Sequence, residues 1–128
     1  MILSARSFED ADETRPFERG QVAVVDLGGR PVSRMTFDPG WRWSRHVKPL
    51  VGTESCGIFH VGYLLSGRLA VRMDDGTEAV AGPGEVVSVP PGHDGWVVGD
   101  EACVMLDWGG TDYALPLTVP GIASPAHR

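Results

Sequence analysis

The chain is divided into short apolar runs by glycine and proline, and this punctuation constrains its fold more than any other feature. Its 128 residues include 17 Gly and 10 Pro, together 27 turn-forming residues, which are spread along the chain without a repeat. No window of 12 or more residues keeps a helical period of 3.6 without a Gly or Pro. The pattern excludes a helical bundle and predicts about nine short strands at the spacing of a β-sandwich or barrel.

Each predicted strand is bounded by turn residues. Asp75-Gly76 is typical of a tight hairpin, because such turns need a positive φ that glycine supplies. Residues 68–73 alternate polar and apolar side chains, as expected for a strand with one face in water. The predicted strands cover residues 22–27, 32–37, 41–47, 56–65, 68–73, 78–81, 85–89, 96–98 and 102–108.

The composition favours one acidic domain of three parts. We expect an acidic N-terminal arm over residues 1–20, a barrel over 21–110 and a proline-rich tail over 111–128. With 11 basic and 17 acidic residues the net charge is −6, which argues against a nucleic-acid or anionic membrane partner. No apolar run is long enough to span a bilayer, and the N-terminus is unlike a signal peptide. A cytoplasmic location is therefore expected, with Cys56 and Cys103 as free thiols.

Three of the four histidines lie in or next to predicted strands. His46 ends the 41–47 segment, His60 lies within 56–65, and His93 follows the Pro90-Pro91-Gly92 break. Imidazoles on three separate strands of a small barrel could converge on its interior. The alternative for each is an ordinary core or surface histidine. The fourth, His127, lies in the tail and is expected to be solvated.

Strand parity adds a thiol to this group. Side chains two residues apart share a face, so Cys56 points inward if His60 does. A thiolate with two or three imidazoles suits divalent Zn, Fe, Co, Ni or Cu better than Mg or Ca. The alternative for Cys56 is a small buried apolar group, and for Cys103 a core position is expected. Tyr63 and Asp107 are candidate interior polar groups with no visible partner.

The glycines, prolines and histidines fall in a pattern that resembles the cupin family of β-barrels. In the first cupin motif, Gly40 is followed by five residues and then by His46, which stands at the first histidine position. His60 stands at the glutamate position, six residues before Gly67. In the second motif, five residues separate Gly84 from Pro90, and Gly92 follows.

The sequence departs from the family pattern at three ligand positions, of which the first is the glutamate position that His60 occupies. Lys48 stands where the second histidine belongs, and Gly95 stands at the histidine position of the second motif. His93 lies two residues before that position. A lysine ammonium inside the barrel would repel a metal or bind an anionic ligand. The insertion over residues 49–55 could act as a flap that carries Cys56 toward the site.

The resemblance implies an all-β, double-stranded β-helix (jelly-roll) barrel, often dimeric, with any site in its interior. The first functional hypothesis is a metal-binding cupin with His46, His60, His93 and Cys56 as ligands. Oxygenase and isomerase chemistries both recur in the family, and the fold does not choose between them. The second hypothesis is a metal-free barrel that binds an anionic small molecule through Lys48, with Trp43 and Tyr63 also contacting the ligand. The third is a structural or regulatory homodimer with a packed interior.

Overall fold

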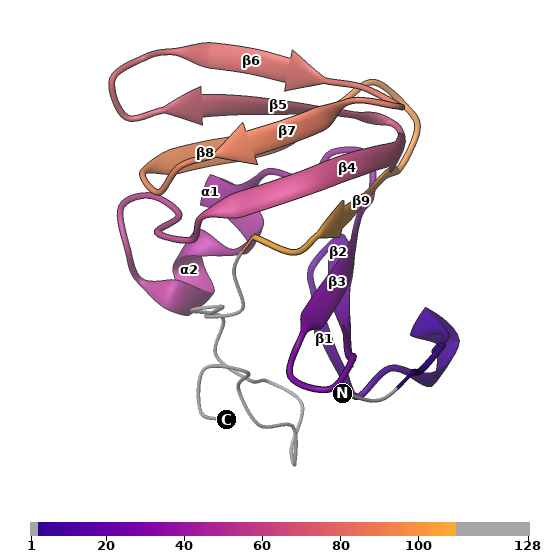
Figure 1. The fold of residues 1–128 in the computed structure, drawn as a ribbon. Coiled ribbons are helices and arrows are strands. Elements are labelled where there is room, and N and C mark those ends of the chain that lie inside the picture. The colour runs from indigo at the N-terminus through magenta and orange to yellow at the C-terminus, as the bar shows by residue number, and fades with distance from the viewer. Residues whose placement is uncertain (1–2, 110–128) are drawn as a thin grey trace.

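The computed structural model describes residues 3–109, which form two antiparallel sheets (Figure 1). The larger sheet has six strands in the order β1 (Glu13–Phe17), β2 (Gly20–Asp26), β3 (Pro31–Phe37), β9 (Cys103–Asp107), β4 (His60–Ser66) and β7 (Val86–Val89). The smaller sheet has the order β6 (Glu78–Ala81), β5 (Arg68–Met73) and β8 (His93–Val98). The helical elements are η1 (Phe8–Asp10), α1 (Trp43–His46) and α2 (Lys48–Val51). This mostly-β, two-sheet architecture confirms the predicted fold class.

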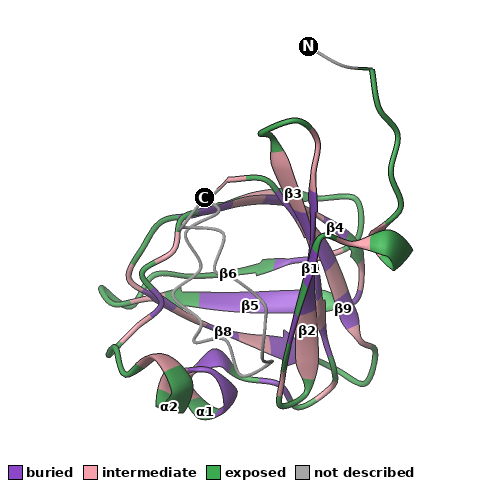
Figure 2. Cartoon of the chain, turned by 90° about the horizontal axis from the view of Figure 1, so that it is seen from below, coloured by how far each residue is buried: buried purple, intermediate pink, exposed green. Residues whose placement is uncertain are grey.

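Alternate residues of the central strands point into the space between the sheets. His60, Gly62 and Leu64 are the buried positions of β4, and Cys103, Met105 and Asp107 are those of β9. On β8 the buried positions are His93, Gly95 and Val97. In Figure 2 the buried segments lie on the strands and α1, whereas exposed residues lie in the turns and on most of β6. The period of two therefore places both apolar core residues and candidate ligands on inner faces.

Eight of the nine predicted strands correspond to strands of the structure, with boundaries shifted by up to four residues. The shift is largest at β4, which begins at His60, because residues 57–59 are outside regular structure and Cys56 forms only an isolated bridge. One strand was not predicted: residues 13–17, expected to belong to a lead-in arm, pair with β2 as β1. The predicted tail over 111–128 and His127 lie outside the described residues.

The prediction of a strand over residues 41–47 is wrong, because residues 43–46 form the helix α1. Trp43, His46 and Val47 are buried, and their spacing of i, i+3 and i+4 is that of one helix face. The apolar residues at 41, 43 and 47 fit a strand period equally well, which explains the error. Pro49 stands in the first turn of α2, where a missing N–H costs no helical hydrogen bond. Together α1 and α2 cover one end of the two sheets (Figures 1 and 2).

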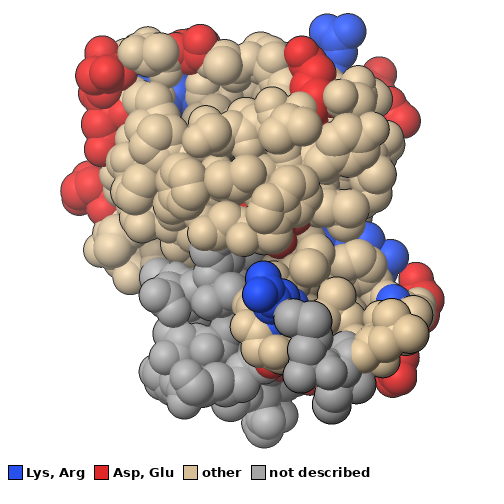
Figure 3. All heavy atoms as spheres, in the orientation of Figure 1, with Lys and Arg blue, Asp and Glu red and all other residues tan. Residues whose placement is uncertain are grey.

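The outer face formed by β4 and β7 carries exposed apolar side chains. Figure 3 shows that Lys, Arg, Asp and Glu side chains lie around the margin of this face. Leu65 on β4 and Val86 on β7 are both exposed there, Val86 by 67%. Among the described residues, no helix is long and apolar enough to cross a membrane. Lys or Arg atoms also appear below the centre of this view.

Candidate metal centre

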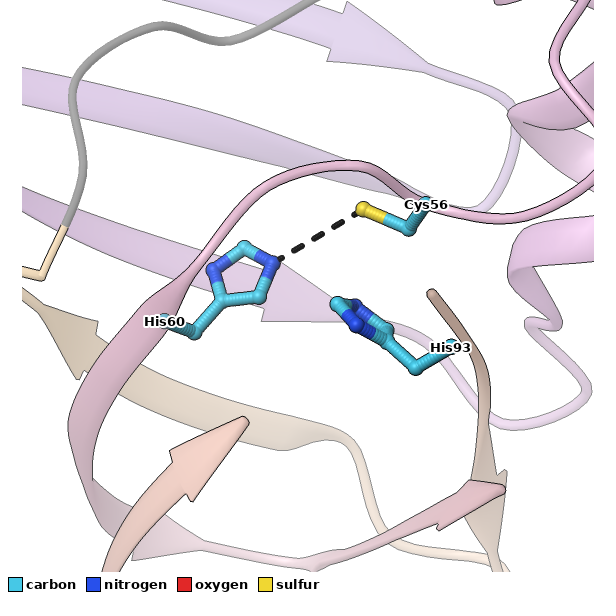
Figure 4. Close-up of side chains that lie close together, drawn as sticks. All are labelled: Cys56, His60 and His93. Atoms are coloured by element: carbon cyan, nitrogen blue, oxygen red, sulfur yellow. Dashed lines mark hydrogen bonds between the residues drawn. The ribbon is translucent and has the colours of Figure 1, made fainter. Parts of the chain in front are cut away.

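Three buried side chains that could hold a metal ion meet between the sheets. The Cys56 sulfur and one ring nitrogen from each of His60 and His93 all lie within 4.8 Å of one another. Cys56 Sγ is 3.9 Å from His60 Nε2. The two imidazole rings meet edge to face, with centroids 5.2 Å apart. Figure 4 shows the three side chains converging from separate segments of the chain.

Backbone pairing brings Cys56 beside His93. The two residues form an isolated antiparallel bridge in which Cys56 N donates to His93 O at 2.8 Å. Gly92 N donates in return to Cys56 O at 2.7 Å. Gly92 has a φ of +93°, and a Cβ there would stand 3.0 Å from an Asp74 carboxylate oxygen, so this turn requires glycine. The segment over 49–55 ends at this bridge, and Cys56 thereby reaches the site.

His60 is oriented by a carboxylate on the neighbouring strand. Its Nδ1 lies 2.5 Å from Asp107 Oδ2, and Asp107 is 1% exposed. The other carboxylate oxygen, Oδ1, accepts from the backbone N–H groups of Val61 at 3.3 Å and Gly109 at 2.9 Å. Because a carboxylate accepts, this contact holds a proton on Nδ1 and turns Nε2 toward Cys56. Asp107 is therefore fixed on both sides and fixes the ring in turn.

His93 is oriented in the same way by a carbonyl. Its Nδ1 lies 2.7 Å from Pro90 O, and because a carbonyl only accepts, Nδ1 must donate. The Pro-Pro-Gly turn that precedes β8 thus supplies the group that fixes the His93 ring. In the neutral forms of His60 and His93, both Nε2 lone pairs are available to a ligand. Anchoring of the distal nitrogen by a carboxylate or carbonyl is the usual support of metal-binding histidines.

The electrostatics of the site favour a charged thiolate. Burial raises the pKa of the Cys56 thiol, but hydrogen bonds with His60 and His93 outweigh burial and lower this pKa to about 6. For His60, burial lowers the pKa, whereas Asp107 and Cys56 outweigh burial and raise it to about 9. Without a metal, the pair therefore carries thiolate and imidazolium near neutral pH. Cys103, by contrast, has only burial acting on it, which raises its pKa to about 12.

The geometry fits a tetrahedral ion after a small contraction. Metal–sulfur and metal–nitrogen bonds near 2.3 and 2.0 Å place the donor atoms of such a site roughly 3.3–3.6 Å apart. The observed Sγ to Nε2 separation of 3.9 Å exceeds this by a few tenths of an ångström, and the 4.8 Å limit for the whole group exceeds it by at most about 1.5 Å. The group could therefore hold a metal ion with modest side-chain movement.

The three donor residues line one cavity between the sheets, with a volume of ≈ 80 Å³. Both sheets contribute to its wall, and Trp43 of α1 and Val51 of α2 line it at the helical end. Phe37 and Trp41 stack in this wall with ring centroids 4.1 Å apart. A metal ion at the group would have three protein ligands and face this space, which is the arrangement of catalytic rather than structural sites.

Comparison with solved structures identifies the architecture. A protein of unknown function from Rhizobium leguminosarum bv. viciae matches with a TM-score of 0.58 and 22% identity over 86% of this chain and 100% of its own. A sugar phosphate isomerase of the cupin superfamily from Silicibacter pomeroyi matches with a TM-score of 0.55 and 15% identity, covering 81% of this chain and 73% of its own. The chain has a cupin fold.

A third cupin-like neighbour is the polyketide cyclase RemF from Streptomyces resistomycificus. It matches with a TM-score of 0.58 and 17% identity over 83% of this chain and 78% of its own. No family model matches the sequence, and no curated protein does. At these identities the likeness shows the cupin fold alone, so the site is interpreted from its own residues.

Within this cupin fold, the structure places His46 outside the group. Its Nδ1 accepts a hydrogen bond from Arg42 N at 3.0 Å, and its Nε2 lies 3.0 Å from Glu18 Oε2. Both ring nitrogens are thus engaged elsewhere. His46 was expected to converge with His60 and His93, and the structure corrects this expectation. Residues 43–46 form helix α1, and the His46 ring lies against Arg42 and Glu18 instead. The spacing from Gly40 resembles the first cupin motif without reproducing its strand.

The candidate ligand-binding residues fall at different places. Trp43 lines the cavity. Lys48 is absent from the cavity wall, and its Nζ lies 3.3 Å from the exposed Glu54 carboxylate. Tyr63 is half-buried on β4, one residue out of phase with His60, Gly62 and Leu64, so it belongs to the opposite face. The structure therefore brings only Trp43 of these three to the cavity.

Asp107 is the site residue whose role the sequence did not show. The sequence makes it a candidate interior polar group. In the structure it pairs with His60 on the neighbouring strand, 47 residues away along the sequence. The signal available was its parity: Cys103, Met105 and Asp107 share one face of a strand that is otherwise apolar. A carboxylate on the inner face of such a strand needs a partner, and a histidine on the adjacent strand is a suitable one.

Proposed function

We propose that this cupin barrel binds one divalent transition metal ion through Cys56 Sγ, His60 Nε2 and His93 Nε2. The observation that carries the proposal is the meeting of the two rings with the Cys56 sulfur, together with the contacts of both Nδ1 atoms with Asp107 and Pro90 O, which leave the Nε2 atoms for a metal. A set of one thiolate and two imidazoles suits Zn, Co, Ni, Fe or Cu. The fourth position would face the cavity and accept a small molecule.

In this proposal the barrel supplies a water-restricted chamber with one Lewis-acidic end. A bound metal would polarise an oxygen or lower the pKa of a coordinated water. The chain's own contribution is to keep the imidazoles oriented through Asp107 and Pro90 O, and to surround the ligand with apolar side chains. The neighbours named above include a cyclase and an isomerase, so the fold itself does not choose the reaction.

Zinc reconstitution tests the proposal. The untagged protein would be stripped with a chelator, incubated with Zn²⁺ and desalted, and its zinc measured by elemental analysis. We expect about one zinc per chain, a large loss in His60→Ala and His93→Ala, and retention in His46→Ala. His46 is the matched control because it is a buried histidine with both nitrogens engaged outside the group. A stoichiometry below about 0.1 would contradict the proposal.

A second candidate function uses the thiol without a metal. Cys56, His60 and Asp107 stand in the order of nucleophile, base and orienting carboxylate, and the pKa of Cys56 is lowered to about 6. This arrangement favours covalent thiol chemistry on an electrophilic small molecule. The two candidates differ in how they use His93. Loss of His93 abolishes zinc binding in the first, whereas in the second His93→Ala slows but does not abolish alkylation of Cys56 by iodoacetamide, because the hydrogen bond with His60 still lowers the Cys56 pKa.

A further inference from the structure

The side chains of the cavity wall determine what kind of molecule can reach the proposed metal. Among residues 3–109, no Lys, Arg, Asp or Glu side chain lines this cavity. Besides the Cys56, His60 and His93 side chains, the polar side-chain groups of the wall are all uncharged: the hydroxyl of Thr53 and the indole N–H groups of Trp41 and Trp43. The remaining lining is apolar and includes four aromatic rings. These rings belong to Phe17, Phe37, Trp41 and Trp43.

A wall of this kind penalises charge on the ligand. A phosphate or carboxylate group of a ligand placed here would lose its hydration, and no cationic side chain of the wall would compensate for that loss. The nearby cations are engaged elsewhere: Lys48 lies by Glu54, and Arg42 lies over the Trp96 ring at 4.3 Å and 3.4 Å from Asp94. The interior therefore offers a ligand the centre for one polar atom, a few uncharged hydrogen-bonding groups, and otherwise apolar contact.

The volume limits the size of the ligand. A water molecule needs about 10–15 Å³ of such space, so ≈ 80 Å³ holds several waters or one small organic molecule. The four aromatic rings favour a flat apolar body, because offset and edge-to-face contacts add to simple burial. A sugar phosphate or a nucleotide would bring charge that no side chain of this wall pairs.

We infer that the ligand is an uncharged, mainly apolar molecule of about one ring, which carries a single donor atom that reaches the Cys56–His60–His93 centre. This inference rests on the proposed function for the role of the donor atom, and on the cavity alone for the apolar body. It replaces the anionic ligand expected from Lys48 with a neutral one, because Lys48 lies outside the wall.

Three probes with the same ring test separately the role of the donor atom and the role of the apolar body. Toluene has no donor, benzyl alcohol has one neutral donor, and benzyl phosphate has a charged headgroup. Binding of each would be measured calorimetrically to the zinc-loaded and to the metal-free protein. We expect benzyl alcohol to bind the loaded protein at least about 10-fold more tightly than benzyl phosphate. In the metal-free protein, toluene and benzyl alcohol should bind with similar affinity.

A pair of glycine variants locates the binding. Gly95 lies in the cavity wall, and a Cβ there would make only ordinary contacts, the nearest 3.4 Å from Ala70 O. Gly95→Ala should therefore fold, add a methyl group beside His93 and weaken benzyl alcohol and toluene by about 10-fold. Gly82→Ala is the matched control, because its Cβ also meets only ordinary contacts and Gly82 is not in the wall. We expect no change there.

The outcomes distinguish this inference from the metal proposal. Tighter binding of benzyl phosphate than of benzyl alcohol would overturn the inference even if zinc binds. So would failure of both neutral probes to bind, or equal effects of Gly95→Ala and Gly82→Ala. If zinc does not bind, toluene should still bind the metal-free protein and still respond to Gly95→Ala; that result would contradict the metal centre and support the apolar ligand.

Discussion

His60 and Asp107 face each other from adjacent strands, with Nδ1 and Oδ2 separated by 2.5 Å. Asp107 pairs with Gly62 in the ladder between β9 and β4, and His60 shares the inner face of β4 with Gly62. The carboxylate thereby lies behind the imidazole and not beside the cavity, since Asp107 is absent from its lining. This relationship makes Asp107 a positioning residue, and it can be tested separately from the metal-binding atoms.

Replacing Asp107 with Asn should weaken zinc binding by about 10- to 100-fold while leaving one site per chain. The amide removes the negative charge that holds the proton on His60 Nδ1 and raises the basicity of Nε2. Competition with a chromophoric chelator measures the affinity. Asp100→Asn, at an exposed turn, is the matched control and should bind as the unchanged protein does. Equal affinity in both variants would mean that Asp107 does not support the site.

His46→Ala should lower stability without changing zinc affinity. The substitution removes the acceptor of Arg42 N and the contact with Glu18, and leaves a space under α1. We expect a loss of about 1–3 kcal/mol in the free energy of unfolding of the metal-free protein, measured in urea. A fall in zinc stoichiometry with this variant would show that the ring turns into the site, contrary to the placement described above.

The ultraviolet thiolate absorption of the folded, metal-free protein should appear with a midpoint at about pH 6, because the pKa of Cys56 is lowered to that value. Cys103 should not contribute, since burial raises its pKa to about 12. Cys56→Ser should abolish the transition, whereas Cys103→Ser should retain it. A midpoint close to 9.0, the ordinary value for the thiol, would contradict the pairing with the histidines.

These two groups also predict how stability depends on pH. His60, with its pKa raised from 6.5 to about 9, contributes stability that is fully present below pH 6.5 and lost as pH rises through about 9. Cys56, with its pKa lowered from 9.0 to about 6, contributes stability that is fully present above pH 9.0 and lost as pH falls through about 6. Between roughly pH 6.5 and 9 the gain by one group and the loss by the other cancel, because folding moves a proton from sulfur to nitrogen. Urea unfolding of Cys56→Ser across this window should therefore show more pH dependence than the unchanged metal-free protein.

Gly62→Ala should destabilise the barrel and disturb the site together. A Cβ at Gly62 would collide with the backbone carbonyl oxygen of Leu106 and crowd the Met105 side chain. Relief of this collision would move β4 away from β9. His60 lies on the same inner face of β4 as Gly62, so the movement would also displace the His60 ring. We expect a cost of about 1–3 kcal/mol in urea unfolding, with weaker zinc binding. Gly82→Ala serves as the neutral comparison.

Much of this fold could be predicted from turn residues and a period of two. The strand over 68–73 shows the reason, since its alternation and its Asp-Gly turn agree with each other and with the structure. The segment over 43–47 could not be assigned in this way, because its apolar spacing satisfies both a strand and a helix. Packing of Trp43 and Val47 around the cavity favours the helix, and this packing cannot be predicted from the local sequence.

The site was harder to predict than the fold for a related reason. Parity predicted that Cys56 points inward if His60 does, and both line the cavity, but Cys56 reaches it through a bridge to His93 rather than along one continuous strand. The partnership of His60 with Asp107 depends on which strands lie side by side, and β4 and β9 are neighbours only in the folded sheet. Such long-range neighbours leave no local pattern in a single sequence.

An anomalous-difference map from crystals of the zinc-loaded protein, recorded on both sides of the zinc absorption edge, tests the central claim most directly. The account predicts a peak bonded to Cys56 Sγ, His60 Nε2 and His93 Nε2 at about 2.0–2.3 Å, open toward the cavity. A peak between His46 and Glu18, or none within bonding reach of the three donor atoms, would contradict it.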